Sequence, residues 1–160
     1  MQKKSIDTPL SEITLRRYEK PYNLKKRELV RKLCLSLGLL NPGDSRDIIV
    51  DILYVLLEAK KENKKLSSEE IREEVINLRK QENLDLNGTA ASNIRRQIRQ
   101  LRNSLLVEKV KNDYRISEFS DLLSIYNEKI EKFMLSSISE RVKEYLIAVD
   151  QNFKKIENTE

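Results

Sequence analysis

Apolar residues recur along most of this chain at the three- and four-residue steps that one face of an amphipathic helix requires. Only three Gly and three Pro are available for turns, whereas a β-sandwich needs a turn every ~8 to 12 residues. The pattern predicts a mainly α fold. We expect four helices over residues 24–37, 45–62, 67–83 and 89–105, and two more between residues 120 and 156.

Cap residues mark where each helix begins. Gly38 is expected to stop the first helix, because glycine readily adopts the left-handed conformation that follows a helix. Ser67 and Glu70 have the Ser-x-x-Glu spacing of a capping box. The predicted N-terminal caps are Asn23 for the first helix, Asp44 or Ser45 for the second, Ser67 for the third, and Asn87 or Thr89 for the fourth.

The second helix is apolar on more than one face, so we expect it at the centre of the core. Its apolar run, Ile48 to Leu57, is interrupted by Asp51. The chain before residue 23 is sparsely apolar, and the segment from Glu12 to Lys20 suits either a short strand or a basic arm. Cys34 belongs to the apolar stripe of the first helix and is expected to be a core residue.

The fourth helix separates apolar from basic residues most sharply. At about 100° per residue, Ile94, Ile98, Leu101 and Leu105 form one narrow stripe. No Asp or Glu occurs between Asp85 and Glu108, although an ordinary exposed helix gains from pairs of opposite charge. The opposite face carries Thr89, Ser92, Arg96, Arg99, Gln100 and Asn103, flanked by Arg95 and Arg102.

Two short β-prone stretches follow the basic helix. Residues 106–110 and 114–116 bracket Asn112-Asp113, which predicts a β-hairpin with a two-residue turn. Three basic residues lie on this hairpin: Lys109, Lys111 and Arg115.

Positive charge is concentrated in two segments. Residues 1–43 carry 10 basic and 4 acidic side chains, and residues 87–116 carry 7 and 2, while residues 44–86 and 117–160 are net acidic. The whole chain has a formal net charge of +5. Two basic segments of this kind are typical of a surface that binds a polyanion such as DNA.

The segment from Ser45 to Ser117 resembles the winged helix-turn-helix family, in its prokaryotic, archaeal-like transcription-regulator form. The likeness is carried by the order of a core helix, a helix, a polar basic helix and a basic hairpin. It implies a domain over residues 44–117, preceded by a basic arm and helix over 1–43 and followed by C-terminal helices over 118–160. It also implies that residues 89–105 form a recognition helix in the major groove of double-stranded DNA, with the hairpin as a wing.

The resemblance assigns base contacts to Arg96, Arg99, Gln100 and Asn103, because Arg matches guanine and Gln or Asn matches adenine in the major groove. Phosphate contacts are expected from Arg95 and Arg102. Ser92 and Thr89 complete this face. The wing residues Lys109, Lys111 and Arg115 and the arm residues Arg16 and Arg17 are expected to contact backbone or minor groove.

Enzymatic chemistry is not expected. The chain has no His and one Cys, which removes the usual zinc and copper ligands and the commonest general base. It has no Gly-rich phosphate loop, so we expect no cofactor. No apolar run approaches the ~20 residues of a membrane span, and Met1-Gln2-Lys3-Lys4 is not followed by a signal-peptide core. We therefore expect a cytoplasmic, nucleoid-associated protein without a membrane partner.

The C-terminal helices raise an open question of partner. Ser137 with Glu140 suggests a second capping box, hence a break after Leu135. The following stripe predicts either a homodimer or a helix that folds back on its own domain; we favour the homodimer, because a regulator that binds two half-sites needs twofold symmetry. The stripe contains Ile138, Val142, Tyr145, Val149, Phe153 and Ile156.

An alternative for the whole chain is a non-catalytic winged-helix subunit of a chromosome or transcription complex that binds a protein partner. RNA binding is less favoured.

Overall fold

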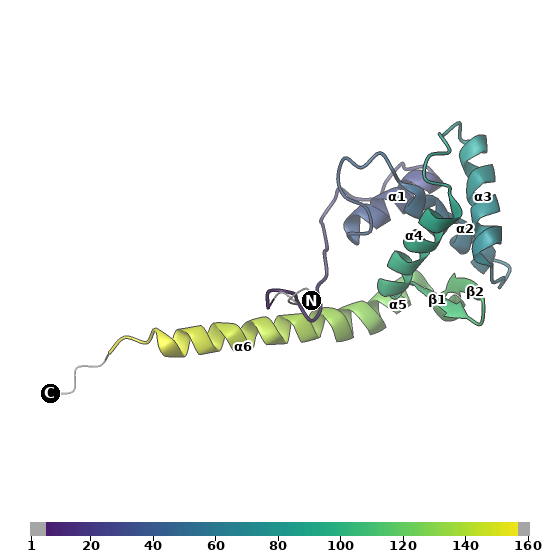
Figure 1. The fold of residues 1–160 in the computed structure, drawn as a ribbon. Helices are drawn as coiled ribbons and strands as arrows, with labels where there is room; N and C mark the ends of the chain where they lie inside the picture. The colour runs from purple at the N-terminus through teal and green to yellow at the C-terminus, as the bar shows by residue number, and fades with distance from the viewer. Residues whose placement is uncertain (1–5, 157–160) are drawn as a thin grey trace.

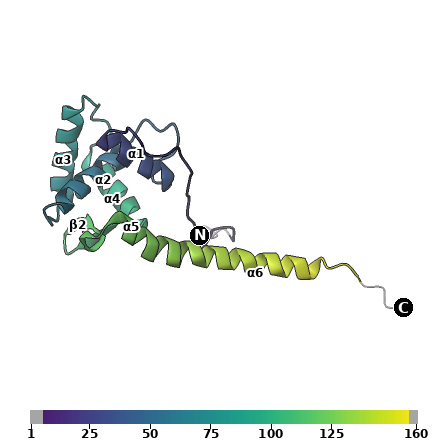
Figure 2. The same ribbon diagram turned by 180° about the vertical axis from the view of Figure 1, so that it is seen from behind.

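A computed structural model describes residues 6–156 as a helical head from which one long helix projects (Figures 1 and 2). Residues 1–5, the start of the expected arm, and residues 157–160 lie outside the described chain. The fold is mainly helical with one small antiparallel sheet, which confirms the expected class. The elements of the head are α1 (Lys26–Ser36), α2 (Ile48–Lys60), α3 (Ser68–Gln81), α4 (Ala91–Asn103), β1 (Val107–Val110) and β2 (Asp113–Ile116).

Helix α2 lies at the centre of the core, as its apolar pattern predicted. It contacts α1, α3, α4 and β2. Ile52 and Leu53 are completely buried, and so is Asp51 on another face of the same helix. One buried cluster extends from Val30 of α1 to Ile125 near the end of the head, so α1 packs into the same core as the following helices.

Of the helices α1 to α4, only α3 begins at its predicted cap. There the Glu70 N–H donates to Ser67 Oγ (3.2 Å) and the Ser67 N–H donates to Glu70 Oε1 (3.1 Å), which confirms the capping box. The other predicted caps are wrong, and none of the N-caps of these three described helices makes a side-chain cap bond. Their N-cap residues are Lys25 for α1, Asp47 for α2 and Ala90 for α4.

Gly38 ends α1 as predicted. Its φ of +71° places it in the left-handed region, and the Leu39 N–H donates to the Cys34 carbonyl (2.9 Å). A Cβ at Gly38 would lie 2.6 Å from Cβ of Thr14. The glycine is therefore required twice, for the helix end and for the close approach of the N-terminal segment.

The N-terminal segment does not form the short strand that the alternation of residues 12–20 allowed. Within the described residues 6–22 no strand is present; the chain runs extended across the end of α1, held by the Arg16 N–H on the Ser36 carbonyl (2.9 Å). A strand needs a paired neighbour along its length. Here the neighbour of the N-terminal segment is the end of α1, so a single backbone hydrogen bond forms in place of the repeated hydrogen bonds of a β-ladder.

The β-hairpin forms where it was predicted, with its turn one residue earlier. Val110 pairs with Asp113, so the two-residue turn is Lys111-Asn112, with Lys111 at φ 57°. A bridge not expected from sequence joins Leu66 to Tyr114, with the Tyr114 N–H on the Leu66 carbonyl (2.7 Å) and the Leu66 N–H on the Tyr114 carbonyl (3.0 Å). This bridge attaches the start of α3 to the hairpin.

The C-terminal region is one continuous helix, so the predicted break after Leu135 is wrong. After a 3-10 turn, η1 (Ser117–Phe119), helical structure runs through α5 (Leu122–Ile125), the π-helical segment η2 (Tyr126–Leu135) and α6 (Ser136–Asn152). The Ser137 hydroxyl donates to the Met134 carbonyl (3.0 Å) and caps nothing. No residue of α6, which the structure describes throughout, is buried, so the helix does not fold back on its own head (Figure 1).

Candidate nucleic-acid interface

Helix α4 is fixed in the head by its apolar stripe. Ile94, Ile98 and Leu101 are fully buried against α2, α3 and β1. The helix ends at Asn103, and Leu105, the fourth residue of the predicted stripe, lies beyond it at φ 72° and is half-buried. The stripe therefore orients the helix, because only one rotation about its axis buries all three of these side chains.

The opposite face of α4 is exposed, as predicted. Arg96 Nη2 donates to Asn93 Oδ1 (2.6 Å), a neutral partner that leaves its charge uncompensated. The other three arginines of α4 make no ion pair with any described residue. The face thus presents four cations to solvent. Its exposed residues are Ser92, Arg95, Arg96, Arg99, Gln100, Arg102 and Asn103.

Two of the polar residues of α4 lie at its edge toward the N-terminal segment. Gln100 Nε2 donates to the Leu39 carbonyl (3.4 Å), and both Gln100 and Asn103 line a pocket shared with Ile13 and Met134. Both amides nevertheless remain exposed beside Arg96 and Arg99.

Thr89 does not belong to the exposed face. It is only 9% exposed, and its hydroxyl donates to the Leu86 carbonyl (2.7 Å). Its carbonyl accepts from Arg72 Nε (2.7 Å), which ties the turn before α4 to α3. The expectation that Thr89 lies on the exposed face of this helix is wrong, because α4 begins at Ala91 and Thr89 lies in the turn that precedes it.

The three basic residues of the hairpin differ in whether they already have a partner within the chain. Arg115 is paired with Glu108 (2.7 Å) and its guanidinium lies 4.8 Å from the centre of the Phe119 ring. Lys109 is exposed above the ring of Tyr114, and Lys111 is exposed in the turn. Lys109 and Lys111 are therefore the basic groups of the hairpin that remain open to a polyanion.

The two arginines of the N-terminal segment also differ in their surroundings. Arg16 Nη1 donates to the carbonyls of Leu35 (2.9 Å) and Leu40 (3.0 Å), so its side chain closes the C-terminal end of α1. Arg17 is exposed. Sequence alone placed the pair on a free arm, whereas the structure uses Arg16 to attach that arm to the head.

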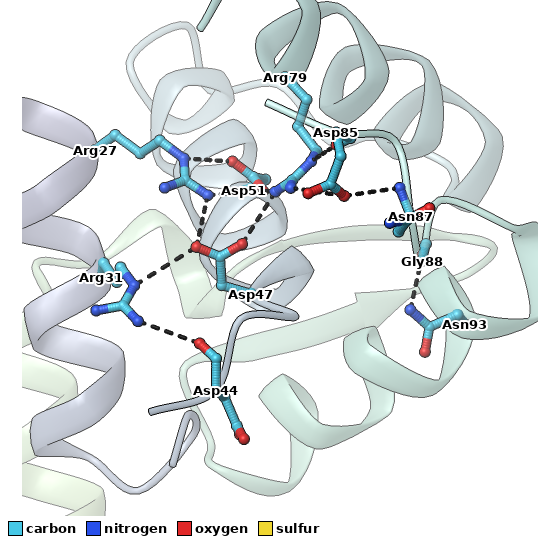
Figure 3. Close-up of polar contacts among 10 residues, drawn as sticks. All are labelled: Arg27, Arg31, Asp44, Asp47, Asp51, Arg79, Asp85, Asn87, Gly88 and Asn93. Atoms are coloured by element: carbon cyan, nitrogen blue, oxygen red, sulfur yellow. Dashed lines mark hydrogen bonds and ion pairs between the residues drawn. The ribbon is translucent and has the colours of Figure 1, made fainter. Parts of the chain in front are cut away.

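A buried ion-pair cluster, formed by Arg27, Asp47, Asp51 and Arg79, joins the first three helices (Figure 3). Arg27 of α1 contacts both carboxylates, Asp51 at 2.8 Å and Asp47 at 3.1 Å. Arg79 of α3 does the same, at 2.6 Å from Asp51 and 3.1 Å from Asp47. Two cations therefore balance two anions, and every buried side-chain polar atom in the described residues has a hydrogen-bond partner.

The cluster favours its ionised form. Burial opposes ionisation of Asp47, but the charges and hydrogen bonds of Arg27 and Arg79 outweigh it and lower the pKa of that carboxyl below its ordinary value of 3.8. Burial likewise opposes the charge of Arg79, and its contacts with Asp51 and Asp47 reverse the effect and raise its pKa. A charge with its partner removed would be left in a low-dielectric site, which is costly.

A line of contacts leads from this cluster to the start of α4 (Figure 3). Arg79 also contacts Asp85, by Nε on its carbonyl and by Nη2 at 3.6 Å from its carboxylate, and that carboxylate accepts from the Asn87 N–H (3.0 Å). The Gly88 carbonyl then accepts from Asn93 Nδ2 (2.7 Å). The cluster thus sets the turn that carries the exposed basic helix.

Sequence reasoning missed this cluster. The signal was Asp51, a carboxylate within a run of apolar residues on a helix that is mostly buried. Such a residue requires a cation, but Arg27 and Arg79 lie 24 and 28 positions away, on helices where many other Lys and Arg residues occur.

Comparison with known proteins identifies no relative: no family model, no curated protein and no solved structure matches this chain. Within residues 6–156 there is no group of three or more acidic or cysteine side chains arranged to hold a metal ion. No helix in the same part of the chain combines the length and the apolar character needed to cross a membrane.

Proposed function

We propose that this chain binds double-stranded DNA in a sequence-specific manner as a winged helix-turn-helix transcriptional regulator associated with the nucleoid. Helices α2, α3 and α4 and the hairpin β1–β2 follow one another in the order of that family. Helix α4 enters the major groove, and the hairpin lies beside the duplex as a wing. The chain performs no catalysis in this proposal and needs no cofactor.

The observation that carries the proposal is the exposed basic face of α4. A major groove ~12 Å wide admits one α-helix, and Arg can bond both O6 and N7 of a guanine. Arg96, Arg99, Gln100 and Asn103 are all exposed on this face and are assigned to base edges; Gln100 also donates to the Leu39 carbonyl. The absence of acidic residues between Asp85 and Glu108 removes repulsion from phosphates.

Phosphate contacts complete the interface. Arg95 and Arg102 flank the outer face of α4, Lys109 and Lys111 stand on the hairpin, and Arg17 lies on the N-terminal segment. Each cation that neutralises a phosphate releases counterions, which strengthens binding at low salt without reading sequence. Arg16 and Arg115 already have partners within the chain and serve to position these segments.

A homodimer through the C-terminal helix belongs to the same proposal. No residue of helix α6 is buried, and a regulator of this kind binds two half-sites ~34 to 36 Å apart on one face of the DNA. Two copies of the head joined by a twofold axis supply the two copies of α4 that such a site requires.

The test is fluorescence anisotropy of the full chain on a labelled random duplex across a salt series. The Arg95→Ala/Arg102→Ala variant, which removes two assigned phosphate contacts of α4, is expected to weaken binding at low salt and to reduce the slope of log K against log salt by about 2, since each phosphate contact contributes about 0.9. Arg141→Ala/Lys143→Ala removes the same charge from α6 and serves as the control, with an unchanged slope.

Two results contradict the proposal. No binding at about 50 mM salt, or an equal loss in the α4 and α6 variants, removes α4 from the DNA interface. Capture of a protein partner that survives in about 0.5 M salt favours instead a winged-helix subunit of a chromosome or transcription complex, because phosphate contacts weaken steeply with salt.

A further inference from the structure

A pocket of about 350 Å³ lies at the base of the long helix, where four segments meet. Its apolar walls include Ile13 and Leu15 of the N-terminal segment and Ile130 and Met134 of η2. Gln100 and Asn103 of α4 contribute polar atoms, and Glu12 adds a carboxylate. The volume lies within the range of ligand pockets, ~300 to 1,000 Å³, and the lining is mainly apolar, which suits an apolar group accompanied by a cation.

The far end of the same helix presents such a group. Phe153 is 83% exposed and Ile156 is 87% exposed, and Lys154 and Lys155 lie between them. These four residues, 153–156, are called the tip below. Exposed large apolar groups at this density mark a binding surface. The tip cannot reach the pocket of its own chain, because α6 has 17 residues and extends about 25 Å from it.

We propose that the tip of a second copy of this chain fills the pocket, so that two α6 helices pack antiparallel and each head receives the tip of its partner. The inference rests on the homodimer proposed above and specifies its orientation. Antiparallel pairing places Met134, at the pocket, opposite Phe153 of the second copy. The same register places Ile138 opposite Val149 and Val142 opposite Tyr145, so apolar residues face one another along the helix.

Charge distinguishes this orientation from the parallel one. In a parallel pair, Lys154 and Lys155 would lie beside the same two lysines of the second copy, and like charges repel. In the antiparallel pair the two tips lie at opposite ends, and each lies beside Glu12 of the pocket as well as Lys132 of η2. Antiparallel helices also bring opposite ends of their dipoles together.

The area is sufficient for a dimer. Seven apolar side chains of α6 and the tip are each more than half exposed, and all of them except Ile147 share one helical face. The six that share this face are the ones that a second helix covers. Covering them removes several hundred Å² from water on each helix, on the order of the ~800 Å² per partner of a standard complex. They are Val142, Tyr145, Leu146, Val149, Phe153 and Ile156.

Disulfide trapping tests the orientation without DNA. The native Cys34 is completely buried and does not compete. Under mild oxidation, the full-length double variant Met134→Cys/Phe153→Cys is expected to form covalent dimers, whereas each single variant stays uncrosslinked. Phe133→Cys/Phe153→Cys is the control: Phe133 is an exposed neighbour that does not line the pocket, so crosslinking is expected to fall at least about tenfold.

A charge swap tests the pocket itself. Glu12→Lys is expected to raise the dimer dissociation constant about threefold, and adding Lys154→Glu/Lys155→Glu is expected to restore it, since exposed ion pairs contribute modestly.

Covalent dimers from the single cysteine variants would show a parallel pair and overturn the inference. A dimeric mass by light scattering without the 134–153 crosslink overturns the orientation alone, and a monomeric mass at about 100 μM overturns the homodimer as well. DNA binding is measured separately in the salt series.

Discussion

The Nη1 atom of Arg79 lies 2.6 Å from Oδ2 of Asp51, and both side chains are buried between α2 and α3. This contact holds α3 against the centre of the core, and through Asp85 it reaches the turn before α4. The stability of the ion-pair cluster and the placement of α4 are thus coupled. Removal of either partner leaves an uncompensated charge in a largely buried site.

Asp51→Asn is expected to lower the free energy of unfolding by about 3 to 5 kcal/mol, because it leaves Arg27 and Arg79 facing a neutral amide. Urea denaturation followed by circular dichroism measures the change. Glu144→Gln removes one partner of an exposed pair with Arg141 and should cost at most about 1 kcal/mol. Equal losses in the two variants would contradict the role of the buried cluster.

Acid is expected to destabilise the chain through Asp47. The pKa of this carboxyl is lower in the folded state than its ordinary value of 3.8, although burial opposes the shift, because Arg27 and Arg79 stabilise the ionised form. The folded state therefore binds fewer protons than the unfolded state. The stabilisation is present above about pH 4 and is lost as the pH falls through the folded-state pKa. Urea midpoints from pH 6 to pH 2 measure it, and Asp47→Asn should flatten the decline; an unchanged decline would exclude Asp47 as its source.

Gly88→Ala is expected to destabilise the head more than Gly43→Ala. Both glycines have positive φ, +85° and +84°, so both alanines incur about 1 to 2 kcal/mol of backbone strain. At Gly88 the new Cβ would also lie 3.0 Å from Cγ1 of Ile48 and 3.1 Å from Nδ2 of Asn93, whereas open space surrounds Gly43. Denaturation midpoints compare the two variants. A similar loss of stability in both would show that Ile48 and Asn93 can move away from the new Cβ without further loss of stability.

Two basic residues should affect DNA binding differently. Arg99→Ala is expected to cost about 1 to 3 kcal/mol on the preferred sequence and to relax the preference, because Arg99 is assigned to a base edge. Lys111→Ala, in the hairpin turn, should weaken all sequences alike. Anisotropy on a selected site and on random duplex measures both, and identical profiles for the two variants would contradict the assignment.

Cys34 is expected to resist thiol reagents in the folded protein. Burial, followed by the negative charge of Asp51, raises the pKa of this thiol to about 12, and the thiolate is the reactive form. Ellman's reagent at pH 8 should therefore label the chain slowly in buffer and fully in about 6 M guanidinium chloride. Rapid labelling without denaturant would mean that the end of α1 opens from the core.

Features that depend on residues close together in the chain were predictable. Ser67 and Glu70 cap α3 within one turn, and Ile94, Ile98 and Leu101 share a face because the helical repeat is a local property. The hairpin and the exposure of the arginines of α4 follow from the same periodicity. Amino-acid order thus sufficed for the helical class and for most of the basic surface.

Features that depend on contacts between distant residues emerged only in the folded chain. The ion pair of Asp51 with Arg79, the attachment of Arg16 to the end of α1 and the burial of Thr89 each require a neighbour supplied by packing. The long helix also continues through Ser137, because the same hydroxyl can cap a helix or donate within one. Local periodicity specifies which face of a helix is apolar, whereas the partner of a charge depends on which helices that apolar face brings together.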